Sequence, residues 1–159
     1  MSEPVLQGKV KTVYDVDGDA SKVTIKFHDK VTAWNGKRVE YPKDKGATCC
    51  LISALLFEKM EKQGIKTHYL GTEGFDTLLC RKLTIIPVEV IVRNIAAGSI
   101  VKNTNINEGT FIQPPIVEYF LKDDAKDDPL LTHDRVRLMG INPDPMKQQA
   151  LEINFQLQS

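Results

Sequence analysis

Alternating apolar and polar positions predict that the first half of the chain is rich in β-strands. Residues 9–15 read as a short strand, and Val23, Ile25 and Phe27 alternate with polar neighbours in the period of two that a half-buried strand shows. The segment 17–21 contains a glycine and lies between the two stretches, as a turn does. We therefore expect a β-hairpin close to the N-terminus.

The period of the apolar positions then changes from two to about 3.6, which indicates a helix over residues 51–63. One face of this helix would carry Ile52, Leu55, Leu56 and Met60. Gly64 stands where a left-handed residue commonly ends a helix. Short strands are expected after this glycine, at residues 66–70 and 77–82.

The second half opens on the clearest strand of the sequence, residues 85–93. Its alternate valines would line one face and leave Glu89, Ile91 and Arg93 on the other. The small residues 96–99 break this pattern and begin a short helix.

Two prolines, Pro114 and Pro115, mark a loop before a further strand at 116–121. A last helix is expected near the end of the sequence, with Asp144 as its N-cap and Pro145 at its first position. Its apolar face would consist of Met146, Ala150, Ile153 and Leu157.

The composition is that of an ordinary soluble globular protein, and it removes several classes of function. Of the 159 residues 42% are hydrophobic and 26% are charged, and 21 basic residues balance 21 acidic ones. A chain without net charge has no bulk field for nucleic acid or an anionic membrane, so neither is expected as a partner. No apolar run approaches the ~20 residues of a membrane span, and no signal peptide is visible.

The three cysteines, Cys49, Cys50 and Cys80, lack the spacing of a disulfide framework or a zinc site. We therefore expect reduced thiols and a cytoplasmic protein. His68 falls in an expected strand and is interpreted as a structural residue.

Lysines near the N-terminus are the first candidates for chemistry. In the heptad that begins at Gly8, Lys9 and Lys11 would share one strand face, where two ammonium groups could meet a polyphosphate. The alternative is a solvated strand face, since surface lysines are common. The sequence has no glycine-rich P-loop, so an ATP-binding protein here would belong to another class.

Arg93 is the second candidate, because it ends an apolar strand just before the helix that begins at Gly98 and Ser99. Backbone N–H groups at a helix start and a guanidinium together suit a phosphate or carboxylate. The alternative is an arginine that pairs with Glu89 beside an ordinary helix start.

Four carboxylates between Lys122 and Pro129 form the third candidate: Asp123, Asp124, Asp127 and Asp128. Such a loop could bind a metal or an amine of a ligand. The alternative is a solvated acidic loop.

These stretches, in this order, resemble the SAICAR synthetase family over most of residues 8–141. The motifs of the first half are Gly8-Lys9-Val10-Lys11-Thr12-Val13-Tyr14, Thr32-Ala33-Trp34-Asn35-Gly36, Lys45-Gly46-Ala47 and Thr67-His68. Those of the second half are Ile86-Pro87-Val88-Glu89-Val90, Val92-Arg93-Asn94-Ile95-Ala96-Ala97-Gly98-Ser99, Leu121-Lys122-Asp123-Asp124-Ala125 and Asp127-Asp128-Pro129.

The resemblance implies an α+β fold, in which a small antiparallel β-rich lobe binds the nucleotide and an α/β lobe binds the substrate across a cleft. The lobes would span residues 1–83 and 84–159. The implied activity is that of a carbon–nitrogen ligase of de novo purine synthesis, which uses ATP to join L-aspartate to carboxyaminoimidazole ribotide and releases SAICAR, ADP and phosphate. We expect these small molecules as partners, together with a homo-oligomer.

Roles for individual residues follow from the resemblance only. The ATP-binding residues would be Lys9, Lys11, Arg81 and Lys82. The ribotide-binding residues would be Arg93, Ser99, Lys122, Asp123 and Asp128. The catalytic residues would be Lys11, Arg93 and Asp128.

Two departures from the family are visible. Cys49 and Cys50 stand where the family has an Asn-Asn pair. The family also continues into an Asp-Phe-Lys-Leu-Glu-Phe-Gly strand and a further acidic strand, whose carboxylates hold Mg2+, and this sequence stops before both. Mg2+ is thus expected beside ATP without assigned ligands, and the alternative function is a non-ligase homologue that binds or converts a related ligand without ATP.

Overall fold

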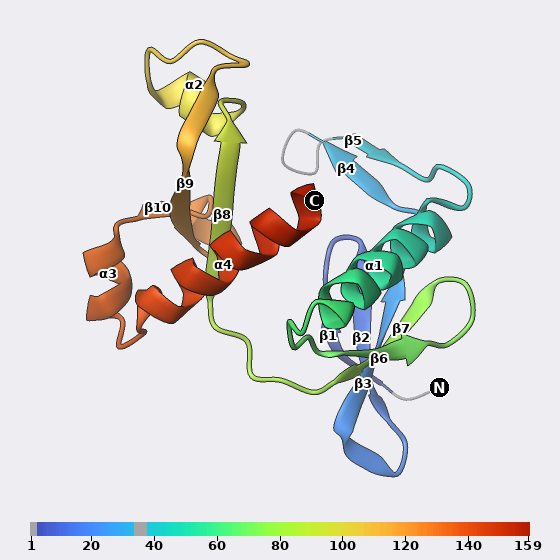
Figure 1. The fold of residues 1–159 in the computed structure, drawn as a ribbon. Coiled ribbons are helices and arrows are strands. Elements are labelled where there is room, and N and C mark those ends of the chain that lie inside the picture. Colours follow the sequence, from blue (N-terminus) through green and yellow to red (C-terminus); the bar gives the residue numbers. More distant parts are fainter. Residues whose placement is uncertain (1–2, 34–37) are drawn as a thin grey trace. The chain divides into compact units, whose positions relative to one another are not determined.

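The computed structural model describes residues 3–33 and 38–159, and it divides into two compact units (Figure 1). The first unit runs to Thr84 and the second begins at Ile85. Each unit combines antiparallel sheets with helices, so the expected α+β class is confirmed. The Trp34-Asn35-Gly36 part of the family motif lies outside the described residues.

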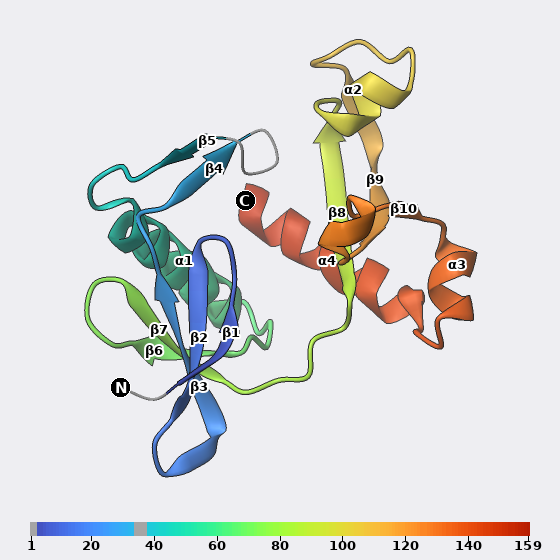
Figure 2. The ribbon, with the colours of Figure 1, turned by 180° about the vertical axis from the view of Figure 1, so that it is seen from behind.

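The first unit is built on a five-stranded antiparallel sheet with the order β1-β2-β3-β7-β6. Its strands are β1 (Pro4–Gln7), β2 (Lys11–Val16), β3 (Asp19–Phe27), β6 (Tyr69–Thr72) and β7 (Thr77–Arg81). A separate two-stranded sheet consists of β4 (Val31–Ala33) and β5 (Arg38–Glu40). The helix α1 (Lys45–Lys62) lies against the larger sheet (Figures 1 and 2).

The N-terminal hairpin predicted from the alternation is present. Strands β2 and β3 pair antiparallel, with Val13 opposite Ile25. The turn between them is tighter than expected, because Asp19 already belongs to β3. Gly18 takes a φ of 81°, a left-handed conformation that costs glycine little.

Helix α1 begins at Lys45, six residues before the predicted start at residue 51. Most of the predicted inner face is wrong, because Ile52 and Leu55 are 51% and 56% exposed and only Met60 of that face is buried. The side chains that do pack on the sheet include Cys50 and Ala54. Small side chains on this face let the helix approach the strands closely, and several larger apolar residues, among them Ile52 and Leu55, are left outside.

The end of α1 agrees with the sequence reading. Gly64 has a φ of 82°, and the N–H groups of Gly64 and Ile65 donate to Glu61 and Met60 carbonyl oxygens at 3.0 and 3.1 Å. These bonds satisfy carbonyl groups that a helix end otherwise leaves unpaired.

The second unit is a three-stranded antiparallel sheet with the order β10-β9-β8 and the helices around it. Its strands are β8 (Val88–Ile95), β9 (Phe111–Leu121) and β10 (Leu130–Leu131). Its helices are α2 (Ser99–Asn103), the short 3-10 helix η1 (Asp124–Lys126), α3 (His133–Leu138) and α4 (Pro143–Gln158). Val88, Tyr119 and Val136 form its buried core.

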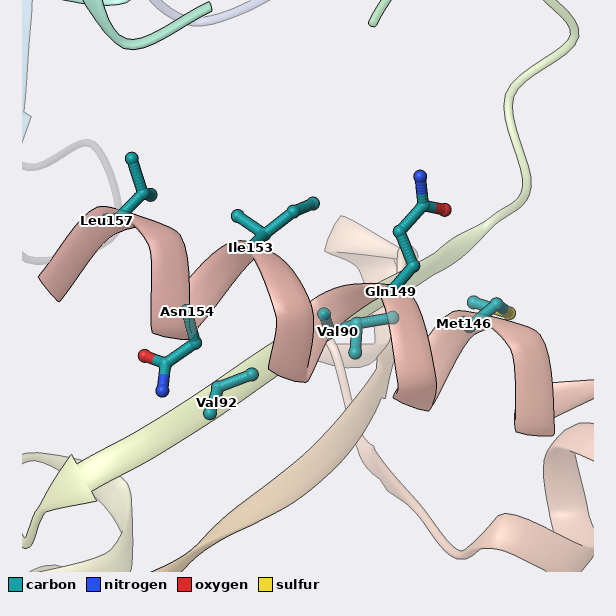
Figure 3. Close-up of a pocket in the computed structure, with 8 residues that line it drawn as sticks. Val90, Val92, Met146, Gln149, Ile153, Asn154 and Leu157 are labelled. Carbon is teal, nitrogen blue, oxygen red and sulfur yellow. The ribbon is translucent and has the colours of Figure 1, made fainter. Parts of the chain in front are cut away.

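Helix α4 crosses β8, and a groove of about 430 Å3 lies between them (Figure 3). The predicted apolar face of the helix lines this groove, namely Met146, Ala150, Ile153 and Leu157. Val90 and Val92 line it from the strand. The side chains of Asn94 and Asn154 further join β8 to α4 through two amide hydrogen bonds of 2.8 and 3.1 Å.

Two details of the second unit correct the sequence reading. Pro114 and Pro115 lie inside β9 rather than in a loop, at the point where the pairing with β8 shifts register between Arg93 and Ile95. A bulge tolerates proline because no ladder hydrogen bond is needed there. The N-cap of α4 is Asn142 and not Asp144, since the Asn142 side chain accepts a bond from the Asp144 N–H at 3.1 Å.

Thiol labelling should separate the three cysteines, which are all free. Cys80 is 0% exposed, and burial raises the pKa of its thiol from 9.0 to about 11, while burial also raises the pKa of Cys50. Because the thiolate is the reactive form, we expect iodoacetamide at pH 8 to modify Cys49 in the native protein. Cys50 and Cys80 should react only in denaturant. Mass spectrometry that found a disulfide, or equal labelling of all three, would contradict this.

Candidate functional site

The first candidate region is the tight turn at residues 8–11, which we call the lysine turn. The Gly8 N–H donates to the Lys11 carbonyl oxygen at 2.8 Å, and β2 starts only at Lys11. Lys9 therefore lies in the turn, and the expectation that Lys9 and Lys11 alternate along one strand is wrong. The Lys11 ammonium sits 4.6 Å from the centroid of the Phe27 ring, a cation–π distance.

His28, which the sequence did not indicate as a functional residue, lies beside the lysine turn. Its backbone N–H donates to the Val10 carbonyl oxygen at 2.9 Å, and its Nε2 is 2.7 Å from the Thr12 hydroxyl. Thr12 is buried, with 3% exposure. The sequence offers no signal for this contact beyond the polar position that follows Phe27 at the end of β3.

The start of α1 is fixed to the same segment. The Asp29 carboxylate accepts a hydrogen bond from the Gly46 N–H at 2.8 Å, and the Lys45 ammonium donates to the Lys30 and His28 carbonyl oxygens at 3.3 and 3.5 Å. A Cβ atom on Gly46 would lie 2.9 Å from the Phe27 carbonyl oxygen. Glycine is thus required where the helix meets the end of β3.

The other two residues of the expected ATP set lie elsewhere in the first unit. The β3 register places Lys11 opposite Phe27, the last residue of the strand, and Arg81 opposite Lys22, near its middle. Phe27 and Lys22 are five residues apart along β3, or about 16 Å at ~3.3 Å per residue. Two side-chain contacts fix the second pair. Arg81 donates to the Thr67 carbonyl oxygen at 3.0 Å, and the Lys82 ammonium is 2.6 Å from an Asp15 oxygen.

His68 precedes β6 rather than lying in a strand, and its ring meets Phe57 edge to face at 5.0 Å. Burial lowers the pKa of His68 below 6.5, and the charge of Lys11 lowers it further. A neutral, packed imidazole agrees with the structural role expected for it.

The second candidate region is centred on Arg93 of β8. Its guanidinium pairs with Glu118 of β9, and the two side chains are 14% and 18% exposed. The alternative partner considered above, Glu89, is wrong, because Glu89 faces Lys122 at 3.4 Å. The register explains the choice: Arg93 lies opposite Ile116, so Glu118 is its diagonal neighbour on the adjacent strand.

Arg93 also reaches the start of α2. Its Nη2 donates to the Ser99 hydroxyl at 2.8 Å and its Nη1 donates to the Ala97 carbonyl oxygen at 3.0 Å. Three neighbouring segments thereby hold one guanidinium in a fixed orientation. Because α2 has only five residues, the positive charge of this site comes mainly from Arg93 and little from a helix dipole.

The acidic loop lies at the opposite end of the β8–β9 hairpin from Arg93. The Asp128 carboxylate accepts a bond from the Asp123 N–H at 2.7 Å, and Lys126 pairs with Asp123 at 2.7 Å. This lysine is the main reason that the pKa of Asp123 lies below 3.8. The structure thus brings Arg93 together with Ser99, and Asp123 together with Asp128, at two ends of one strand pair.

Metal ligands do not converge in the part of the chain that the structure describes. Among the side chains that the structure describes over residues 3–33 and 38–159, no three of His, Cys, Asp or Glu are placed to hold one ion. Over the same residues, no helix is both long and apolar enough to cross a bilayer.

The chain is similar in sequence to known proteins. Residues 4–159 match the family model described as SAICAR synthetase. The phosphoribosylaminoimidazole-succinocarboxamide synthase of Synechocystis sp. is 42% identical over 160 residues, which cover 98% of this chain and 60% of the relative. The synthase of Sulfurisphaera tokodaii is 47% identical over 127 residues, which cover 80% of this chain and 53% of the relative.

Solved structures of the same kind share the fold. The synthase of Ehrlichia chaffeensis superposes with a TM-score of 0.92 at 32% identity and covers 98% of this chain and 67% of that one. A SAICAR synthetase (Type-2) in complex with ADP gives 0.90 at 34% identity, over 96% of this chain and 66% of that one. These likenesses confirm the expected fold. The chain spans about 60% of the length of the Synechocystis relative.

Proposed function

Because this chain belongs to the SAICAR synthetase family, we propose that it carries the nucleotide and ribotide sites of an ATP-dependent ligase that joins L-aspartate to carboxyaminoimidazole ribotide. The observation that supports this best is the contact of Arg93 with Ser99 at 2.8 Å. A half-buried guanidinium that is fixed by a carboxylate and a hydroxyl is pre-organised to bind an anion such as a ribotide phosphate.

The reaction would proceed in two displacements. A carboxylate oxygen of the ribotide attacks the γ-phosphorus of ATP, ADP leaves, and an acyl phosphate forms. The amine of aspartate then attacks the acyl carbon and loses a proton, and phosphate leaves as the amide bond forms. Positioning and charge neutralisation, rather than a protein nucleophile, would supply most of the rate.

The proposed residues fall into groups that this fold keeps together. Lys9 and Lys11 in the lysine turn would hold the ATP phosphates, and the backbone of residues 81–86 would meet the adenine. The separation of Lys11 from Arg81 along β3 suits a ligand as extended as a nucleotide. Residues 1–83 would therefore bind the nucleotide, and residues 84–159 would bind the ribotide.

The ribotide-binding set would be completed at the other end of the β8–β9 hairpin. Lys122, Asp123 and Asp128 lie beyond Leu121, which is itself about 16 Å along the strand from Arg93 at ~3.3 Å per residue. With Lys11 and Arg93, Asp128 would form the catalytic set. Ligands for Mg2+ are not assigned, since no three suitable side chains converge among the side chains that the structure describes, and we derive no step through it.

The remaining proposals concern the assembly and its location. We propose a homo-oligomer, which is supported by apolar side chains that α1 leaves exposed, among them Leu51 at 60%. Sedimentation equilibrium that returned the monomer mass of 17.9 kDa would contradict this. A cytoplasmic location agrees with the free thiols.

A coupled assay of ADP release tests the proposed activity directly. The chain is mixed with ATP, aspartate and carboxyaminoimidazole ribotide, with and without Mg2+, and the succinocarboxamide product is identified by mass spectrometry. Product that forms only when all three substrates are present supports the ligase. Ribotide binding without ADP release would instead support the non-ligase alternative.

ATP binding should depend on the lysine turn. We expect Lys11→Ala to weaken ATP by about 1 kcal/mol, or roughly fivefold, the usual contribution of an exposed ionic contact. Asp127→Asn tests whether a carboxylate of the acidic loop holds the metal, in which case it should reduce the Mg2+ dependence of ATP binding. Calorimetric titration at several Mg2+ concentrations measures both variants. Tight, strongly magnesium-dependent binding that neither substitution changes would show that the nucleotide binds elsewhere.

A further inference from the structure

The lysine turn is anchored by one residue, His28, which follows the last residue of β3 and acts through both its backbone and its ring. Two bonds carry this anchor. The His28 N–H donates to the Val10 carbonyl oxygen inside the turn, and its ring Nε2 lies 2.7 Å from the Thr12 hydroxyl just after the turn. His28 therefore contacts the chain on both sides of Lys11.

The contact with Thr12 is an interior one. Thr12 is 3% exposed, and it is the one polar residue that is buried among the described residues. A buried hydroxyl that loses its partner costs more than an exposed one, because water cannot replace the bond. His28 thus satisfies a group that would otherwise destabilise the start of β2.

The segment that carries His28 is itself held by α1. The Asp29 carboxylate accepts from the Gly46 N–H, and the Lys45 ammonium reaches the carbonyl oxygens of His28 and Lys30. A chain of contacts then runs from an 18-residue helix through His28 to the lysine turn. The lysine turn is thus supported by a helix. A surface loop that is held only by one internal hydrogen bond would lack this support.

We infer that His28 is a positioning residue that orients the lysine turn toward the polyphosphate of a nucleoside triphosphate. This inference rests on the proposed nucleotide site. The Thr12–His28 bond fixes the backbone around Lys11. The ammonium of Lys11 lies 4.6 Å from the centroid of the Phe27 ring. A turn that is ordered before binding loses little conformational freedom when the phosphate binds. Removal of the Thr12–His28 bond should therefore weaken nucleotide affinity.

The test compares three single variants of the full chain with ATP as the probe. His28→Ala removes the ring and Thr12→Val removes the hydroxyl with little change of shape. Each should weaken ATP about threefold to tenfold, the net effect of one lost hydrogen bond. His28→Gln can place its amide nitrogen near the position of Nε2 and should restore most of the affinity. The double variant should bind no worse than the weaker single one.

Two further measurements distinguish positioning from simple stabilisation. Hydrogen exchange at residues 8–12 should accelerate in His28→Ala and Thr12→Val and stay slow in His28→Gln. His133→Ala is the control: it removes another histidine ring that contacts a polar side chain, here an exposed bond of 3.0 Å to Asp144 in the second unit. It should lower thermal stability without changing ATP affinity.

The outcomes separate this inference from the proposed function. If Lys11→Ala weakens ATP and His28→Ala does not, the nucleotide site stands and the positioning role is overturned. If neither variant changes the affinity, the nucleotide site is misplaced and both proposals fall. A lower melting temperature of His28→Ala with unchanged ATP affinity would reduce His28 to a structural residue.

Discussion

Replacing Arg93 by alanine should weaken ribotide binding by about 2–4 kcal/mol, the loss that follows removal of a desolvated charged contact to an anion. The guanidinium is 14% exposed and is already oriented by Glu118, Ser99 and the Ala97 carbonyl oxygen. Isothermal calorimetry with carboxyaminoimidazole ribotide measures the effect. An unchanged affinity would remove Arg93 from the site.

Two companion variants make the result specific. Arg93→Lys keeps the charge but not the planar fork, so it should recover only part of the affinity. Arg137→Ala removes an exposed arginine that pairs with Asp144 at 2.9 Å, and it should leave ribotide binding unchanged. Equal losses for Arg93→Ala and Arg137→Ala would indicate a general effect on the second unit.

The second large effect is expected at Gly46, where we predict that Gly46→Ala lowers the free energy of unfolding by about 1–3 kcal/mol. The added methyl group would stand 2.9 Å from the Phe27 carbonyl oxygen, which is backbone and cannot swing aside. Urea denaturation followed by circular dichroism measures the change.

The sign of this change is diagnostic. Glycine to alanine inside an unobstructed helix stabilises by up to about 1 kcal/mol, so the predicted loss requires the contact with Phe27. Thr48→Ala, an exposed position in the same part of α1, is the matched control and should change little. A stabilised Gly46→Ala protein would show that the helix and β3 are not in close contact.

Local patterns predicted the elements well where the apolar side chains of an element gather on one face. The alternation of Val23, Ile25 and Phe27 led directly to β3, and the period of Met146, Ala150, Ile153 and Leu157 matched the side of α4 that lines the groove. The capping signal also predicted the end of α1 correctly, since Gly64 has the expected left-handed φ.

The pattern failed on α1 because that helix carries two competing stripes. Large apolar residues such as Ile52 and Leu55 face outward, and much of the inward stripe, namely Gly46, Cys50 and Ala54, is small and weakly hydrophobic. Which of the two stripes faces the sheet depends on how close the helix lies to it. That distance is a tertiary property, and no local period contains it.

The partners of charged side chains could likewise not be predicted from the sequence. Arg93 and Glu89 are close in sequence and share a strand face, yet Glu118 is the partner because β9 lies beside β8 in a particular register. His28 and Thr12 meet for a similar reason, through the pairing of β2 with β3. Sequence could nominate Arg93 as a candidate, but only the paired strands identify what orients it.

The two hydrophobic clusters each draw their buried residues from a single unit, and this bears on how unfolding is observed. A protein with two cores need not melt in one cooperative step, and a single midpoint can then average two events. A spectroscopic probe attached within one unit and the far-ultraviolet signal of the whole chain then report different events. Disagreement between these two spectroscopic reporters would be a property of the architecture.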